Sequence, residues 1–161
     1  MTTRPSDPPA APSAETRHAS AVAAQTPGGP CAALILGPSG AGKSALALDM
    51  ISRGAVLVAD DQVRLRRRGA RVIASAPEPL AGLIEARGLG LIETPALPEA
   101  PVVCVVDLSE TETRRLPPRR EAPLLGLALP RILAPPAPLP AASLAPALLA
   151  LLRAGGARRA P

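Results

Sequence analysis

The sequence has 161 residues, a length that suits one domain, and a formal net charge of +5. It contains no Phe, Tyr or Trp, so its core must consist of aliphatic residues, and single-stranded nucleic acid, which stacks on aromatic rings, is disfavoured as a partner. One histidine and two cysteines without a C-x-x-C pair argue against a zinc site, and the lack of a secretory signal or membrane-spanning stretch favours the cytoplasm.

The two ends of the chain are expected to lie outside the domain. Residues 1–15 are rich in Pro, Ala, Ser and Thr and have no apolar period, and residues 154–161 are mostly small and basic. We therefore predict one domain over residues 16–153, with disordered tails on both sides.

The first clear elements are a strand, a loop and a helix. Residues 32–36 are an apolar run that predicts a buried strand, and the glycine-rich octet 37–44 follows it directly. Residues 44–52 consist largely of helix-forming Ala, Leu and Met. Arg53 and Gly54 suit the C-terminal end of that helix, because Arg complements the helix dipole and Gly accepts a left-handed conformation.

Further strands and one further helix follow. The segment 117–140 is too rich in proline for a helix or a central strand. Residues 143–153 predict a helix with Ser143 as its N-cap and Pro146 in its first turn. The expected strands are 56–59, 63–65, 71–74, 83–85 and 102–106, with Gly69 at the turn of a hairpin. The fold class is therefore α/β, a twisted mixed sheet flanked by helices.

The octet between the first strand and helix matches the P-loop pattern at each fixed position. Its glycines let successive backbone N–H groups point at phosphate oxygens, and the helix directs its positive end there. Lys43 is the single lysine in the chain, and its compact charge suits the β- and γ-phosphates, while the hydroxyl of Ser44 suits Mg²⁺. The predicted nucleotide-binding residues are Gly37, Pro38, Ser39, Gly40, Ala41, Gly42, Lys43 and Ser44.

Phosphoryl transfer also needs carboxylates, and two apolar runs end in Asp. Asp60 and Asp61 follow residues 56–59, and Asp107 follows residues 102–106. Two adjacent carboxylates point different ways, so one can face a metal and the other a substrate. The simpler interpretation of the pair is the start of a turn.

The stretch 85–90 reads Glu-Ala-Arg-Gly-Leu-Gly inside an apolar region. Buried charge is costly unless it is paired or binds a metal, so Glu85 and Arg87 are candidates for metal or phosphate binding. The alternative is a surface ion pair beside a turn.

Five arginines cluster in the predicted hairpin at residues 63–74. The structural interpretation is a hairpin whose charges are simply solvated. The functional interpretation is a docking patch for an acidic partner. These residues are Arg64, Arg66, Arg67, Arg68 and Arg71.

The order of these motifs resembles the catalytic domain of bacterial HPr kinase/phosphorylase. The motifs are Gly-x-Ser-Gly-x-Gly-Lys-Ser at 37–44, Arg53-Gly54, Leu-Val-Ala-Asp-Asp at 57–61 and Glu-x-Arg-Gly-Leu-Gly at 85–90. The last is the most specific, because ordinary P-loop kinases do not carry it. The resemblance covers about residues 32–92.

The resemblance implies an ATP- and Mg²⁺-dependent kinase that phosphorylates a serine of the phosphocarrier protein HPr and can remove that phosphate by phosphorolysis. Lys43 would contact phosphates, Asp61 would exchange the serine proton, and Ser44, Glu85 and Asp60 would lie at the metal. The family is hexameric, so a homo-oligomer is expected.

Two further residues enter through the same resemblance. His18 matches a histidine upstream of the family's P-loop, which would place a strand near residues 21–24, and Arg115 matches an arginine after the later strand. The family's proline- and arginine-rich loop, associated with phosphorolysis, falls near residues 130–140, where Arg131 is the single arginine. An acidic residue commonly follows the P-loop serine, and here it is Ala45.

Two other classes of function share the P-loop. A small-molecule kinase would need a lid and a substrate pocket. A non-enzymatic nucleotide sensor would bind ATP and change a partner contact without transfer, but such a sensor needs neither Asp61 nor Glu85.

Overall fold

The computed structural model describes residues 12–136 and 141–156, and the side chains of 141–143 are outside that description. The expected tails therefore lie mostly outside the described residues. The first strand begins at Ala14, two residues before the predicted domain boundary, and it adds to a sheet edge by pairing with β5. The last helix ends at Arg153, as expected.

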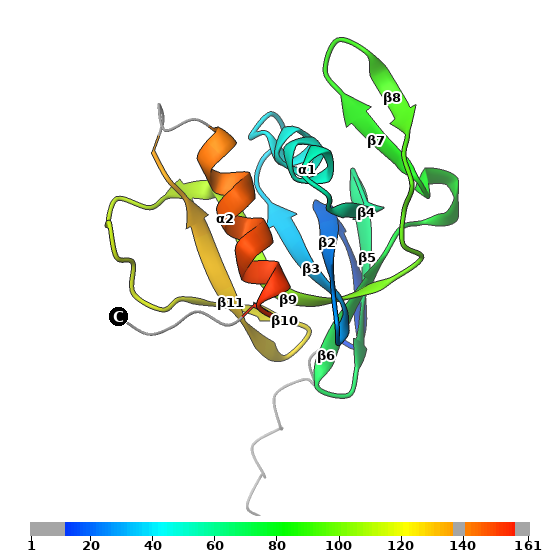
Figure 1. Cartoon of the computed structure of the whole chain (residues 1–161). Helices are drawn as coiled ribbons and strands as arrows, with labels where there is room; N and C mark the ends of the chain where they lie inside the picture. The colour runs from blue at the N-terminus through cyan, green and yellow to red at the C-terminus, as the bar shows by residue number, and fades with distance from the viewer. Residues whose placement is uncertain (1–11, 137–140, 157–161) are drawn as a thin grey trace, which may run out of the picture.

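One large mixed sheet organises the fold (Figure 1). Its main path runs β1-β5-β6-β9-β3-β2-β4, with β10 and β11 attached beside β9. Parallel pairing joins β9 to β3 and to β11, and the remaining pairs are antiparallel. The strands are β1 (Ala14–His18), β2 (Ser20–Thr26), β3 (Gly29–Leu36), β4 (Val56–Ala59), β5 (Gln62–Arg68), β6 (Arg71–Ser75), β9 (Ala100–Thr111), β10 (Glu121–Leu124) and β11 (Leu127–Ala134).

The remaining elements are two helices, a short 3₁₀ turn and a separate hairpin. The helices α1 and α2 lie side by side on the same face of the sheet, and the hairpin projects from the body (Figure 1). No helix in the described part of the chain combines the length and apolarity needed to cross a membrane. The elements are α1 (Lys43–Ser52), η1 (Glu78–Leu80), β7 (Leu83–Ala86), β8 (Gly90–Glu93) and α2 (Ala141–Arg153).

The central strands are buried on both faces, as parallel strands usually are. On β3, Ala33 and Ile35 contribute to the core under the helices, whereas Ala32 and Leu34 contribute to a second core on the opposite face. Cys104 on β9 is buried in the first core, as its apolar neighbours predict. Leu, Val, Ile and Ala supply most of both cores, which confirms the aliphatic interior expected without aromatic residues.

The proline-rich segment corrects one prediction. It forms the hairpin β10–β11, and β11 adds to the sheet beside β9. Proline cannot donate a ladder hydrogen bond. The pairing of β11 with β9 uses residues 131–134, which contain no proline. Pro123 and Pro130 lie instead in the pairing between β10 and β11. Composition over the whole segment therefore hid a short proline-free stretch that can pair.

The last helix also starts earlier than expected. It begins at Ala141 rather than Ser143, so Pro146 lies in the second turn and not in the first. The N-cap role predicted for the Ser143 side chain falls outside the described residues.

Candidate functional site

The P-loop lies between β3 and α1, and two of its glycines are required by geometry. A Cβ atom on Gly37 would come within 3.1 Å of the side chains of Ala41 and Leu108. Gly42 precedes the helix with φ of 95°, in the left-handed region that glycine adopts most readily. The backbone of α1 therefore starts directly at the loop, and the positive end of its dipole faces the loop.

Lys43 is buried, and its ammonium group turns back onto the loop. Nζ donates hydrogen bonds to the carbonyl oxygens of Gly37 at 2.8 Å and Pro38 at 3.0 Å. An ammonium group has three N–H donors, so one remains for a further acceptor. The lysine both holds the loop in shape and presents positive charge to whatever the loop encloses.

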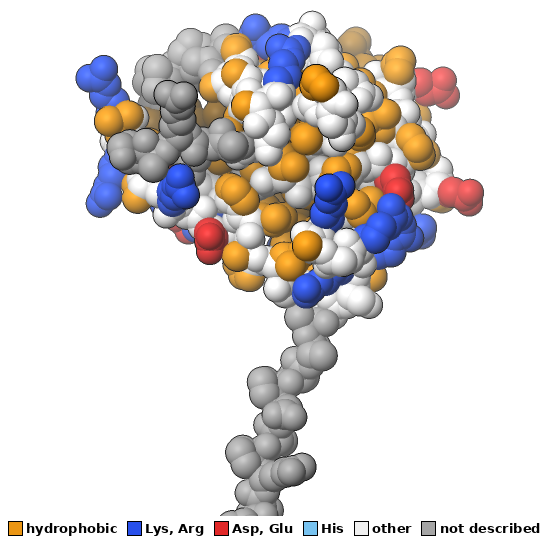
Figure 2. Space-filling view, turned by 60° about the horizontal axis from the view of Figure 1, so that its bottom comes forward, with side chains coloured by type: hydrophobic (Ala, Val, Ile, Leu, Met, Phe, Trp, Pro, Cys, Tyr) orange, Lys and Arg blue, Asp and Glu red, His pale blue; other side chains and the backbone are white. Residues whose placement is uncertain are grey.

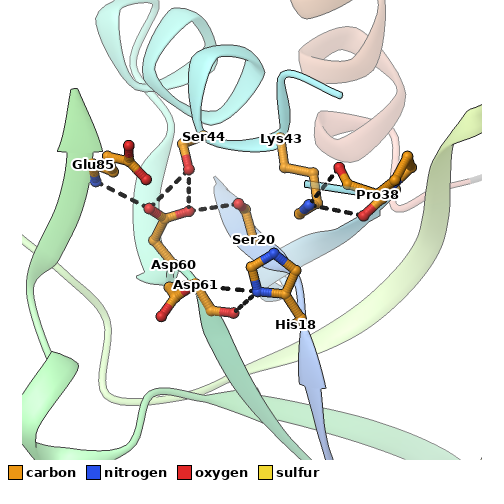
Figure 3. A network of polar contacts seen from close by, with 9 residues as sticks. His18, Ser20, Pro38, Lys43, Ser44, Asp60, Asp61 and Glu85 are labelled. Carbon is orange, nitrogen blue, oxygen red and sulfur yellow. Dashed lines mark hydrogen bonds and ion pairs between the residues drawn. The ribbon is translucent and has the colours of Figure 1, made fainter. Parts of the chain in front are cut away.

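Asp60 is the centre of a buried polar cluster (Figure 3). Its carboxylate, on a residue that is 3% exposed, accepts hydrogen bonds from the hydroxyls of Ser20 at 2.5 Å and Ser44 at 2.9 Å. It also accepts one from the backbone N–H of Glu85 at 3.0 Å. The carboxylate therefore ties β2, α1 and β7 to the end of β4, and its burial is compensated by donors from each of these elements.

Asp61 differs from its neighbour in exposure and conformation. Its side chain is 59% exposed, and its φ of 65° lies in the left-handed region, which Asp tolerates better than most residues. His18 Nδ1 lies 2.9 Å from the Asp61 carbonyl oxygen and 3.2 Å from Oδ1. Both oxygens are acceptors, so Nδ1 carries a proton, and the histidine orients the exposed carboxylate.

A cavity of about 200 Å³ opens beside the P-loop. Residues 40 and 42–45 line it together with Leu48 of α1 and two residues of the projecting hairpin, Glu85 and Arg87. No ion pair joins Glu85 to Arg87 among the described residues, so the surface ion pair considered from the sequence is not formed. The hairpin instead brings both charges to the same cavity as the P-loop.

The donor set at this cavity suits a hard divalent cation. Ser44 directs its hydroxyl proton to Asp60, which leaves the oxygen lone pairs available, and Glu85 lines the same cavity. Among the described residues, no three His, Cys, Asp or Glu side chains converge on one point. Mg²⁺ commonly takes one or two protein ligands and completes its shell with phosphate oxygens and water, so the residues fit such an ion in the company of phosphates.

Two other residues singled out in the sequence form no hydrogen bond or ion pair with this cluster in the part of the chain that the structure describes, although Asp107 is the register partner of Leu36, directly before the P-loop. Asp107 accepts hydrogen bonds from Ser109 and pairs with Arg131 at 2.7 Å, so it is committed to an ion pair. Burial acts to raise the pKa of Asp107, but these hydrogen bonds and the arginine charge hold it below its ordinary value. Arg115 is exposed in the loop between β9 and β10, and within the described chain no hydrogen bond or ion pair joins it to the site.

The arginine-rich hairpin is β5–β6. Arg64, Arg66 and Arg68 alternate along one exposed face of β5, and Glu99 pairs with Arg66 at 3.2 Å and Arg68 at 2.8 Å. The hydrogen bond from Arg68 lowers the pKa of the Glu99 carboxyl. Figure 2 shows basic side chains gathered beside acidic ones at this end of the molecule. Both interpretations of the cluster, solvated face and docking patch, stay predictions.

Ser20 was not a candidate from the sequence, because a serine within an alanine-rich strand carries no motif. Its hydroxyl is fully buried and donates the shortest hydrogen bond to Asp60. A usable signal was present, since a polar residue inside a buried strand needs a partner.

Comparison with known protein families matches residues 16–98 to the HPr Serine kinase C-terminal domain. The chain belongs to this family. The match begins near His18 and ends after the Glu85 hairpin, so it contains the P-loop, the paired aspartates and the cavity-lining glutamate. The family resemblance predicted from the motifs is confirmed.

Individual relatives agree with this assignment. Proteins named HPr kinase/phosphorylase from Bordetella pertussis and Clostridium tetani are 56% and 48% identical over 61 and 64 residues, which is 37% and 40% of this chain. One from Mycoplasmopsis pulmonis is 39% identical over 89 residues, 51% of the chain. These matches span 20%, 21% and 29% of the relatives' own lengths.

A solved structure is similar over nearly the whole chain. The Hpr(Ser) kinase/phosphatase from Coxiella burnetii superposes with a TM-score of 0.71 and 26% identity, over 88% of this chain and 90% of that one. The predicted α/β fold with a mixed sheet and packed helices is confirmed.

Proposed function

We propose that this protein is an ATP- and Mg²⁺-dependent kinase that phosphorylates a serine of an HPr-like phosphocarrier protein. The observation that supports it most is the convergence of Lys43, Ser44 and Glu85 on one cavity, with Asp61 and His18 beside it (Figure 3). A bare nucleotide-binding loop would need neither the glutamate nor the exposed carboxylate. Membership of the HPr kinase family supports the same reaction class.

The nucleotide phosphates would lie against the P-loop backbone and the N-terminus of α1, with Lys43 as the point charge. Mg²⁺ would be held by Ser44 and Glu85 and would neutralise charge on the phosphate oxygens. Asp60 would act behind the ion, because it already holds the Ser44 hydroxyl and the Glu85 backbone. This assigns the two aspartates different tasks.

Asp61 would accept the proton of the attacking serine. The serine oxygen forms a bond to the γ-phosphorus, the bond from that phosphorus to ADP breaks, and the proton passes to the carboxylate. His18 holds Asp61 from one side through Nδ1. The high exposure of Asp61 suits a macromolecular substrate, whose serine must reach the carboxylate from outside.

Four finer features belong to the same proposal. The kinase would act in the cytoplasm, where ATP is supplied, and would form a homo-oligomer. Phosphorylation of HPr would be the primary activity rather than phosphorolysis, because the segment 130–140 has few arginines and so differs from the family's proline- and arginine-rich loop. Residues 137–140 of this segment lie outside the described chain. Arg115 would take part in the same reaction, as its match to the family segment implies.

The experiment is transfer of labelled phosphate from ATP to HPr with Mg²⁺, using HPr whose target serine is replaced by alanine as the control. Label on wild-type HPr alone is the expected result. Adding phosphate afterwards and measuring pyrophosphate tests phosphorolysis, and the mass in solution tests the oligomer. ATP binding without label on HPr would contradict the proposal and favour a small-molecule kinase or a sensor.

A further inference from the structure

The β7–β8 hairpin carries an unusual pair of exposed leucines. In the described chain, the exposed large hydrophobic residues are Leu89 at 81%, Leu91 at 65% and Leu116 at 73% exposure. The first two lie at the turn and start of β8, on an element that projects from the body (Figure 1). Adjacent exposed apolar side chains are a common feature of contact surfaces, whereas single ones are not informative.

The two faces of this hairpin differ in environment. Ile84 and Ile92 are opposite each other, and they pack into the core that α1 covers. Leu91 is directly opposite Glu85, so these two side chains share the other face. Glu93 lies on that face as well, because side chains two apart on a strand point the same way. Since Glu85 lines the phosphate cavity, Leu91 lies on the face that borders it.

The hairpin is held along its first strand, since Ala86, the last residue of β7 before the turn, is 5% exposed. The backbone N–H of Glu85 donates to Asp60, and Ile84 is fully buried. The tip is therefore fixed in place next to the cavity while its leucines stay in solvent. Such a preorganised surface loses little conformational freedom when it binds a partner.

Charge also distinguishes this face. Glu93 is exposed, and no described side chain forms an ion pair with it. An exposed carboxylate beside two leucines complements an apolar patch that has a basic residue at its border. A nucleotide offers neither feature, whereas a folded protein surface can offer both.

We propose that Leu89, Leu91 and Glu93 dock the protein substrate, through an apolar patch with a basic side chain beside its target serine. This inference rests on the proposed function, because a serine that reaches the γ-phosphate must come with its protein to the rim of the cavity. The hairpin is part of that rim through Glu85 and Arg87.

The test compares KM for HPr with the Kd for ATP in the presence of Mg²⁺. The double variant Leu89→Ser/Leu91→Ser should raise the KM for HPr roughly tenfold or more, because both contacts are removed, and leave the nucleotide Kd unchanged. Leu116→Ser is the matched control, since it removes an equally exposed leucine outside the hairpin, and it should change neither value. Glu93→Lys should raise the KM and alter its dependence on salt.

Each contrary result has a distinct meaning. If wild type phosphorylates HPr and the double variant keeps its KM, the docking surface is wrong and the proposed function stands. If wild type transfers no phosphate to HPr, both fail. If the KM is unchanged but the mass in solution falls, the face belongs to a contact between copies of the chain, which also overturns the inference.

Discussion

Asp60 and Asp61 are neighbours in sequence and opposites in environment. Asp60 is enclosed by Ser20, Ser44 and the Glu85 backbone, whereas Asp61 faces solvent with His18 at its side. The backbone of Asp61 has a left-handed φ, so the two consecutive side chains are directed into different surroundings. One peptide bond therefore separates a carboxylate that builds the site from one that is free to meet a substrate.

The largest expected effect comes from Asp61→Asn. The amide cannot accept the serine proton at neutral pH, so kcat should fall by about 10²–10⁴-fold. Because the residue is exposed and Asn tolerates the same φ, stability should stay within about 0.5 kcal/mol of wild type. Phosphotransfer kinetics and denaturant unfolding measure the two quantities. Retained turnover would show that another group takes the proton.

The same chemical change one residue earlier should act on stability. Asp60→Asn leaves one carbonyl oxygen for three donors and directs an amide group at one of them, so unfolding should become easier by about 2 kcal/mol. Affinity for nucleotide should fall in the presence of Mg²⁺ and change little in EDTA. Calorimetric titration under both conditions measures this. A variant as stable as wild type would contradict the role of Asp60 as the buried acceptor.

Ser20 gives a smaller and more specific effect. Ser20→Ala removes one donor to the buried carboxylate, with an expected loss of about 1–2 kcal/mol and a weaker Mg²⁺-dependent gain in nucleotide affinity. Thr26→Ala is the control, since it removes a hydroxyl from the same strand whose bond goes to the Gly29 carbonyl. The control should lose some stability and keep the Mg²⁺ dependence. Equal behaviour of the two variants would mean that Ser20 only supports the strand.

The smallest effect concerns Asp107, an acid that belongs neither to the Asp60 cluster nor to the Asp61–His18 pair. Its folded pKa is lowered, so its ion pair with Arg131 contributes stability fully above the ordinary Asp pKa. That contribution is lost as pH falls through the lowered value. Unfolding measured between neutral and acidic pH should show a shallower loss for Asp107→Asn than for wild type. Parallel curves would show that this carboxylate is not stabilised by its arginine.

The sequence alone predicts the parts of this site whose signals are local. The P-loop, the paired aspartates and the Glu85 motif each lie within a few residues, and the structure brings all three together. A polar residue within an alanine-rich strand indicates that Ser20 needs a partner, but no local signal identifies that partner, because Asp60 is 40 residues away. Pairing of β11 with β9 and the early start of β1 likewise depend on neighbours distant in sequence, whereas proline content and tail-like composition are local.

Arg115 is a position that was transferred by motif resemblance alone. The residues around it resemble a family segment, yet its place depends on the loop between β9 and β10, which no local pattern fixes. The role of Arg115 in the site therefore stays a prediction, whereas Lys43, Ser44 and Glu85 line one cavity in the structure.

The exposed hairpin tip has a practical consequence in spectroscopy. Because the chain contains no Phe, Tyr or Trp, it has no aromatic emission of its own. A Leu89→Trp variant would place a single fluorophore at the most exposed of the described leucines, on the hairpin that borders the phosphate cavity. Its emission would move to shorter wavelength when an apolar surface covers the tip. With a partner that itself lacks tryptophan, that signal would follow the encounter in real time.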